Sequence, residues 1–112
     1  MGMDLTKQKC EPCEGGVKPF DSDEIKTYMT YLKTPWEVYD DGKKIERKFK
    51  FKDFVENMKF VNKVADIAEN EGHHPDFEIN YSKTKITLWT HAIGGLSVND
   101  FIVASKIEQI SS

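Results

Sequence analysis

The sequence predicts an α+β fold with the element order αββαββα, in which three helices pack on one face of a four-stranded antiparallel sheet. Three observations lead to this prediction. Three segments repeat apolar residues at helical spacing, two pairs of shorter segments alternate apolar and polar residues, and Gly, Pro and Asp mark the turns between them. At 112 residues the chain has room for one domain of this kind.

The first helix follows Pro19. Asp21 or Ser22 can cap its N-terminus, acidic residues occupy its first turn, and Pro35 ends it. Its apolar positions recur at i, i+3, i+4 and i+7, namely Ile25, Tyr28, Met29 and Leu32. This spacing predicts a helix with one apolar face.

A β-hairpin is expected next, because residues 36–39 alternate and lead into the turn Asp40-Asp41-Gly42-Lys43, whose Asp-Gly pair is typical of hairpins. The returning strand sorts its side chains onto two faces. Ile45, Arg47, Phe49 and Phe51 fall on one face, and Lys44, Glu46, Lys48 and Lys50 fall on the other.

The second helix begins after Asp53, where the apolar period changes to 3.6 residues. Gly72 is a natural C-cap and Pro75 lies beyond it, so the helix is expected to stop there. The predicted apolar stripe consists of Phe54, Met58, Val61, Ala65 and Ala68, widened by Val55 and Val64.

A second hairpin is predicted over residues 77–91, because apolar residues alternate on both sides of the turn at 82–84. The third helix follows, with Ser97 as N-cap and Asp100 at the third helical position. Its apolar residues lie nearly all round its circumference: Val98, Phe101, Ile102, Val103, Ala104, Ile107 and Ile110. Since one sheet face cannot cover them all, we expect a homo-oligomer, dimer or tetramer, that buries the second side.

Residues 1–20 show no helix or strand period and are expected to be a flexible N-terminal segment, followed by a single domain over residues 21–112. The segment contains Cys10 and Cys13 in a CxxC arrangement. A structural zinc site would need two more ligands at fixed spacing, and the sequence has no second CxxC. Free thiols are therefore favoured over a redox or metal role.

Composition excludes several classes of protein. The net charge is -3, with 16 basic and 19 acidic residues interleaved, which argues against nucleic-acid binding. No apolar run approaches the roughly 18 residues that span a bilayer, and the N-terminus lacks the layout of a signal peptide. A cytoplasmic location without membrane association is expected.

Two of the three histidines, His73 and His74, lie together in the stretch EGHHPDFE that follows the second helix. Glu69 precedes His73 by one helical turn and is expected to hold its ring, while Pro75 biases His74 to an extended conformation, so that the two rings diverge. The second hairpin should return His91 to the same place. We therefore expect all three rings to line one pocket.

Histidines in this arrangement favour general acid–base catalysis without a metal, in which one ring donates a proton and another accepts one. Zinc binding is the less favoured alternative, because adjacent histidines chelate one ion poorly and no HxH or HExxH spacing is present. No recognisable serine or cysteine nucleophile elbow lies in this stretch.

These residues carry a resemblance to a known family. The pattern Glu69-x-x-x-His73-His74-Pro75, followed by Tyr81, His91 and Asp100, resembles the signature of the pterin-4a-carbinolamine dehydratases. The similarity runs from about Asp21 to Ile110 and includes the segments KFKFKDFVENMKFVNKVADIAE and ITLWTHAIGGLSVNDF.

The resemblance implies dehydration of 4a-hydroxytetrahydropterin to quinonoid dihydropterin, which recycles the cofactor of aromatic amino acid hydroxylases. It assigns proton transfer to His73 and His91, the orientation of the pterin ring to His74, and support of His73 to Glu69. The pterin would be gripped by a rim formed by Gly72, Trp89, Thr90, His91 and Ala92. For Asp100 a helix cap is favoured over a role in the site. No cofactor or metal is implied.

Two other functions stay open from the sequence. The fold could serve as a non-catalytic dimerisation or assembly module with unused histidines, or, less favoured, as a zinc hydrolase. The joint presence of Glu69, His73, His74 and His91 favours the enzyme, because a module freed from catalysis need not keep all four.

Overall fold

A computed structural model gives the fold of the chain and describes residues 5–10 and 18–111. The predicted order αββαββα is confirmed, with two additional short 3-10 helices. The elements are η1 (Leu5–Lys7), α1 (Ser22–Met29), β1 (Glu37–Tyr39), β2 (Lys44–Lys50), α2 (Phe54–Glu71), β3 (Asp76–Asn80), β4 (Lys83–Leu88), η2 (His91–Ile93) and α3 (Val98–Ser111).

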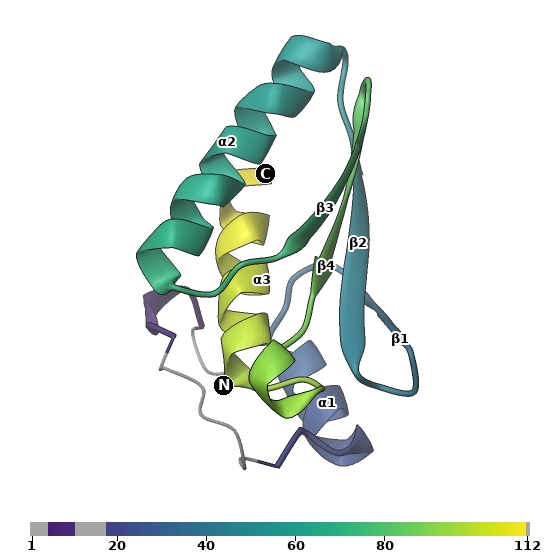
Figure 1. Ribbon diagram of the computed structural model, residues 1–112, viewed down its shortest axis with the longest axis vertical. Helices are drawn as coiled ribbons and strands as arrows, with labels where there is room; N and C mark the ends of the chain where they lie inside the picture. Colours follow the sequence, from purple (N-terminus) through teal and green to yellow (C-terminus); the bar gives the residue numbers. More distant parts are fainter. Residues whose placement is uncertain (1–4, 11–17, 112) are drawn as a thin grey trace.

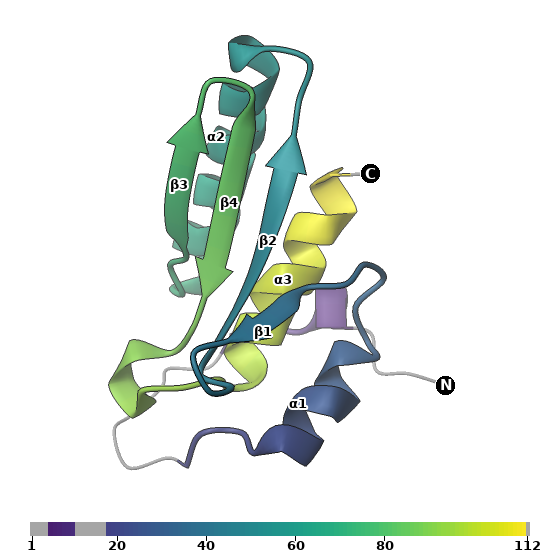
Figure 2. The ribbon, with the colours of Figure 1, turned by 90° about the vertical axis from the view of Figure 1, so that its right-hand side faces the viewer.

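The four strands form one antiparallel sheet in the order β1-β2-β4-β3. The two long central strands are paired from Ile45 opposite Leu88 to Lys50 opposite Lys83. Helices α2 and α3 lie side by side against one face of this sheet, and α1 packs near its β1 end beside α3 (Figures 1 and 2). The predicted α+β layering is therefore confirmed.

Side-chain caps set the helix starts. Asp21 and Glu24 form a reciprocal capping box at α1, with the backbone N–H of Glu24 donating to Asp21 at 2.9 Å and that of Asp21 donating to Glu24 at 3.0 Å. Asp53 accepts from the N–H of Glu56 at the start of α2. Gly72 ends α2 in the left-handed conformation, with φ of 67°.

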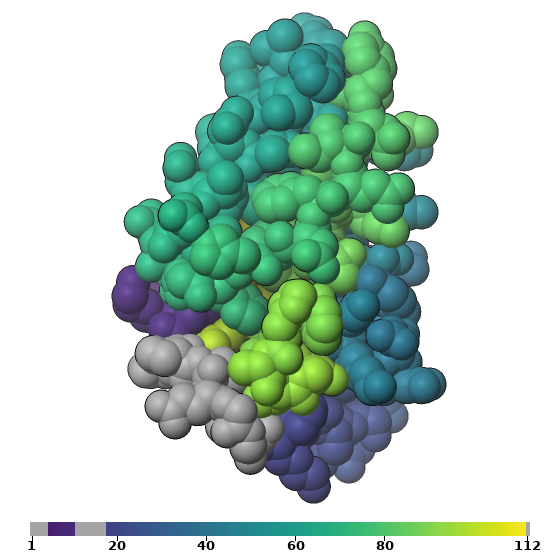
Figure 3. Space-filling model, viewed as in Figure 1, coloured from purple at the N-terminus to yellow at the C-terminus, as the bar shows by residue number. Residues whose placement is uncertain are grey.

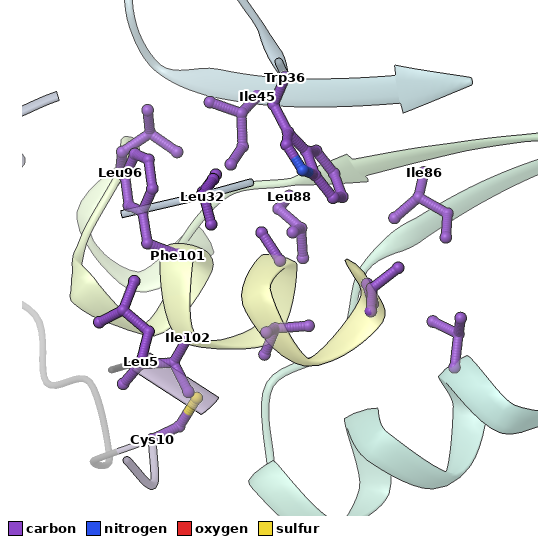
Figure 4. Close-up of a cluster of buried hydrophobic side chains, with 14 of the residues drawn as sticks. Leu5, Cys10, Leu32, Trp36, Ile45, Ile86, Leu88, Leu96, Phe101 and Ile102 are labelled. Carbon is purple, nitrogen blue, oxygen red and sulfur yellow. The ribbon is translucent and has the colours of Figure 1, made fainter. Parts of the chain in front are cut away.

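The hydrophobic core lies between the sheet and the helices. On the sheet side it contains Trp36, Ile45, Ile86 and Leu88, and α3 contributes Phe101 and Ile102 from the helix layer (Figure 4). The apolar face predicted for the second strand of the first hairpin is thus the inner face of the sheet.

Helix α3 is buried on both sides within a single chain. Leu5 and Cys10 lie next to Ile102, on the side of α3 away from β2 (Figure 4), and they are only 1% and 8% exposed. The N-terminal segment therefore covers the side that was expected to need a second subunit, and the apolar circumference of α3 no longer supports an oligomer. No helix among residues 5–10 and 18–111 is long and apolar enough to cross a bilayer.

The described part of residues 1–20 packs on the domain, in contrast to the expectation of a flexible segment. Besides Leu5 and Cys10, the backbone N–H of Phe20 donates to Leu96 at 2.8 Å, and its ring lies 4.8 Å from that of Tyr28. Cys10 is a free, buried thiol. Cys13 lies outside the described residues, and the domain boundary at residue 21 stays a prediction.

The buried face of α2 differs from the predicted stripe. Phe54 and Val55 are 48% and 60% exposed. The buried positions are Val64 and Ala68, which were predicted, and Asn57 and Phe60, which were not. The burial of Asn57 is explained by its hydrogen bonds, since its amide donates to the carbonyls of Tyr81 at 2.9 Å and Lys83 at 3.2 Å and accepts from the Thr84 hydroxyl. A fully bonded amide can occupy a core position that apolar patterning overlooks.

Candidate active site

A pocket of about 390 Å³ opens where the end of α2, the end of β4 and the start of α3 meet. Figure 3 shows the segment around residues 89–95 beside the end of α2 and the start of β3 on one face of the molecule. The pocket is lined by Gly72, His73, His74, Pro75, Asp76, Trp89, Thr90, His91, Ala92 and Asn99. The three histidines therefore share one pocket, and so do all seven residues expected to bind the substrate.

His73 follows Gly72, the left-handed C-cap residue of α2, and so lies just outside the helix. Its backbone N–H still donates to the carbonyl of Ala68, at 3.2 Å, which ties the residue to the last turn of α2. Its Nε2 lies 2.6 Å from Oδ1 of Asp100, and the side chains of the two residues are 11% and 0% exposed. A nearly buried imidazole thus faces a fully buried carboxylate.

The predicted contact between Glu69 and His73 is wrong. Glu69 Oε2 instead lies 2.5 Å from Nε2 of His74, and the two side chains are 78% and 61% exposed. The i,i+4 relation holds only inside a helix, and Gly72 turns the chain away before His73. The ring that receives the Glu69 carboxylate is therefore the outer one.

Asp100 serves the helix and the pocket together. Its Oδ2 accepts from the backbone N–H of Ser97 at 3.0 Å, which is the predicted cap, and from the Thr90 hydroxyl at 2.8 Å. Its Oδ1 is the atom that meets His73. The preference for a cap alone was incomplete, because one carboxylate has enough lone pairs for all three partners.

A chain of hydrogen bonds supports the Asp100 carboxylate, and sequence reasoning missed it. The hydroxyls of Thr90 and Ser97 lie 2.8 Å apart, and Ser97 Oγ accepts from the N–H of Asn99 at 3.3 Å. Because the Thr90 hydrogen is directed to Asp100, the Ser97 hydroxyl donates to Thr90. All hydrogen bonds of this chain point toward the Asp100 carboxylate, so they strengthen one another and hold the carboxylate in place.

His91 has a different environment. It begins η2, inside a loop that is closed by hydrogen bonds between Thr90 and Gly95 and turned by Gly94 at φ of 65°. Its exposed ring lies 3.9 Å from the Trp89 ring, at 34° between the planes. The pocket therefore offers one sheltered ring held by a carboxylate and one exposed ring held by an aromatic side chain.

Trp89 is in turn fixed from two directions. Its indole N–H donates to Asp76 at 3.3 Å, and the Lys44 ammonium lies 4.7 Å from the ring centroid. Asp76 was not predicted, and only its place at the start of the strand paired with β4 could have indicated it.

Among the described residues, no three His, Cys, Asp or Glu side chains gather closely enough to hold a metal ion.

The chain matches the family model of pterin 4 alpha carbinolamine dehydratase over residues 18–110. This match covers far more than half of the chain. The chain belongs to the pterin 4 alpha carbinolamine dehydratase family.

Curated relatives agree with this family over nearly their whole length. A protein of Alkaliphilus metalliredigens is 46% identical over 108 residues, which are 96% of each chain, and one of Nitrosomonas europaea is 44% identical over 107 residues, which are 96% of this chain and 93% of the relative. Both relatives are named pterin-4-alpha-carbinolamine dehydratase, and in both cases the name is provisional. The coverage includes the N-terminal segment that packs on α3.

Solved structures agree on the fold. A protein of Brucella melitensis described as a transcriptional coactivator/pterin dehydratase matches with a TM-score of 0.79 and 30% identity, over 85% of this chain and 100% of its own. A pterin dehydratase-like RuBisCO assembly factor matches with a TM-score of 0.63 and 17% identity, over 71% and 93%. The second likeness shows the fold alone.

Proposed function

We propose that the chain dehydrates 4a-hydroxytetrahydropterin to quinonoid dihydropterin and water. In this reaction the C4a–O bond breaks, the hydroxyl leaves as water after it receives a proton, and the N5 proton departs as the C4a–N5 double bond forms. No electron acceptor is needed. The observation that carries the proposal is the His73–Asp100 pair in a pocket shared with His91.

His73 is suited to proton transfer because Asp100 sets its tautomer. An ionised carboxylate only accepts hydrogen bonds, so Nε2 of His73 carries a hydrogen and Nδ1 is the nitrogen that exchanges a proton with substrate. The carboxylate also stabilises the imidazolium that forms when Nδ1 takes a proton, as in other Asp–His pairs. A positioned acid or base of this kind contributes about 10²- to 10⁴-fold to the rate.

His91 would supply the second proton-transfer group, and Trp89 keeps its ring in the pocket wall. His74, paired with Glu69, would orient the bicyclic ring at the outer edge. The rim from Trp89 to Ala92, with Gly72 opposite, would grip the pterin. A pocket of about 390 Å³ is within the range of small-ligand sites.

The cellular role we propose is recycling of the pterin cofactor of aromatic amino acid hydroxylases. We also propose that the chain forms a homo-oligomer in the cytoplasm. Because α3 is covered internally, the interface would use exposed apolar side chains elsewhere, of which Val55, Ile79 and Tyr81 are 60%, 40% and 70% exposed.

A non-catalytic module is the second candidate. It is favoured by the Brucella melitensis relative, whose description combines a transcriptional coactivator with a pterin dehydratase. This candidate predicts that a variant with all three histidines replaced assembles and binds partners like the wild-type protein.

Stopped-flow absorbance of chemically generated 4a-hydroxytetrahydropterin tests the enzyme. We expect wild-type protein to accelerate the decay, and His73→Ala and His91→Ala each to lose about 10²-fold or more. Glu56→Gln, on the exposed start of α2, is the control and should match wild type. Decay that is unchanged when wild-type protein is added would falsify the proposed activity.

A further inference from the structure

We infer that Glu71 is a positioning residue that holds His73 against Asp100, and that it couples the packing of the N-terminal segment to the pocket. The inference rests on the proposed function where it concerns catalysis. Glu71 is the last residue of α2 and lies two positions before His73. It does not line the pocket, so any effect it has on the reaction must pass through other residues.

Glu71 is held by two different elements. Its Oε2 lies 2.5 Å from the Lys106 ammonium on α3, and its Oε1 accepts from the backbone N–H of Cys10 at 2.8 Å. Its side chain is 8% exposed. Burial alone would raise the pKa of this carboxyl, but Lys106 and the Cys10 N–H outweigh burial and hold the pKa below its usual 4.5.

The Glu71–Lys106 pair joins the end of α2 to α3, and the His73–Asp100 pair joins the residue just after the α2 C-cap to α3. Asp100 and Lys106 are six residues apart on α3, which is about 9 Å along the helix axis. Glu71 and His73 are separated only by Gly72, whose left-handed conformation leaves His73 outside the last turn of α2. Two links in parallel fix both the distance and the direction between the helix ends, whereas one link leaves rotation free.

The N-terminal segment is part of this arrangement. Lys9 donates to the carbonyl of Asn70 at 3.0 Å, and the Cys10 thiol lies 3.6 Å from the carbonyl of Asn99, a pocket-lining residue. Residues 9 and 10 thus contact the end of α2 and the start of α3 together. Glu71 is the side chain that connects Cys10 to Lys106.

Weakening the Glu71 links should let the end of α2 move away from α3. The hydrogen bond between His73 and Asp100 would then lengthen or break part of the time. Because a displacement of about 1 Å at a catalytic group costs as much as about 10²-fold in rate, a small shift of His73 is enough to be measured.

The test is Glu71→Gln, which keeps the side-chain shape but has only one oxygen for two donors. We expect kcat to fall about 10-fold with KM changed by less than about twofold. In protein labelled with ¹⁵N-histidine, we expect the proton on Nε2 of His73 to lose its strongly hydrogen-bonded, downfield position and to exchange faster with water. Lys106→Met removes the other partner and should change the same resonance.

Glu108→Gln is the matched control. Glu108 is a buried carboxylate on α3 that does not line the pocket, and it is bonded to the N–H groups of Lys33 and Thr34 at 3.0 and 2.8 Å. Its substitution should lower stability without moving the His73 resonance. The inference is overturned if both folded Glu71 and Lys106 variants keep the wild-type resonance, or if Glu108→Gln moves it equally. The His73 resonance is measured without substrate. If the wild-type protein proved inactive, the proposed function would be wrong, but the effect of Glu71 on the His73–Asp100 hydrogen bond would still be tested.

Discussion

Nε2 of His73 lies 2.6 Å from Oδ1 of Asp100, so the ring that follows α2 and the carboxylate that begins α3 form one hydrogen-bonded unit. The same carboxylate caps α3 through Ser97 and accepts from Thr90. A residue needed to start a helix is thereby also the residue that orients the sheltered histidine. The carboxylate that caps α3 therefore also fixes one wall of the pocket.

Asp100→Asn should separate these two roles. The amide oxygen can still accept from Ser97 or Thr90, but its NH₂ group then faces His73 and forces the ring to present a lone pair on Nε2, which is the wrong tautomer. We expect kcat to fall about 10²-fold or more and stability to fall by about 1–3 kcal/mol. Dehydration kinetics and urea denaturation measure the two effects.

The control for Asp100→Asn is Asp66→Asn, which makes the same change on the exposed surface of α2. It should alter neither the rate nor the stability. Full activity in the Asp100→Asn protein would show that the carboxylate is only a cap, as the sequence alone suggested.

Glu69→Gln should have a weaker effect, because Glu69 contacts the exposed His74 and not His73. An exposed pair of this kind contributes about 0–1 kcal/mol to stability. We expect KM to rise about threefold with little change in kcat, since His74 is proposed to bind the pterin ring and not to transfer its proton. If Glu69→Gln lowered kcat as much as Asp100→Asn, Glu69 would have to support the proton-transferring His73, as the sequence predicted.

The Cys10 thiol should be unreactive in the folded protein. Burial, followed by the charge and hydrogen bond of Glu71, raises the pKa of Cys10 from 9.0 to about 12. At pH 8 its thiolate fraction is then lower by about a thousandfold than that of an ordinary thiol, and the thiolate is the form that reacts. In a Cys13→Ser protein, iodoacetamide should label Cys10 only after guanidinium unfolds the chain. Rapid labelling of native protein would show that residues 5–10 detach readily from α3.

Acid should remove the stabilising contribution of Glu71. Because its pKa is lowered in the fold from 4.5, the charged carboxylate stabilises the protein above pH 4.5, and this contribution disappears as the pH falls through the lowered pKa. Wild type should exceed Glu71→Gln in stability by about 2 kcal/mol at pH 7, and the difference should shrink below pH 4.5. Urea denaturation from pH 3 to 7 measures it. A difference independent of pH would mean that packing, and not charge, is what the substitution removes.

Element order and the shared histidine pocket could be predicted because they depend on local patterns: apolar period, turn residues and the return of a hairpin. The partners of the histidines could not. Glu69 is at the right helical spacing for His73, yet Gly72 breaks the helix between them. Asp100 was predicted to be a helix cap, and its Oδ2 does cap α3. The sequence did not indicate that its other oxygen, Oδ1, contacts His73. The packing of residues 5–10 against α3 was not predicted, because these residues show no helix or strand periodicity. Leu5 is nevertheless only 1% exposed.

Self-association should therefore use a surface other than α3. Strand β3 is an edge of the sheet, and an edge strand presents unpaired backbone groups that another chain can join. Ile79 on this strand is 40% exposed. We expect sedimentation velocity to show an oligomer at micromolar concentration and Ile79→Lys to shift it toward monomer, because a buried lysine at a paired edge is unfavourable. Val38→Lys tests the opposite edge, since Val38 on β1 is 42% exposed. If only the second substitution dissociates the oligomer, β1 and not β3 forms the interface, and a monomeric wild-type protein would contradict self-association altogether.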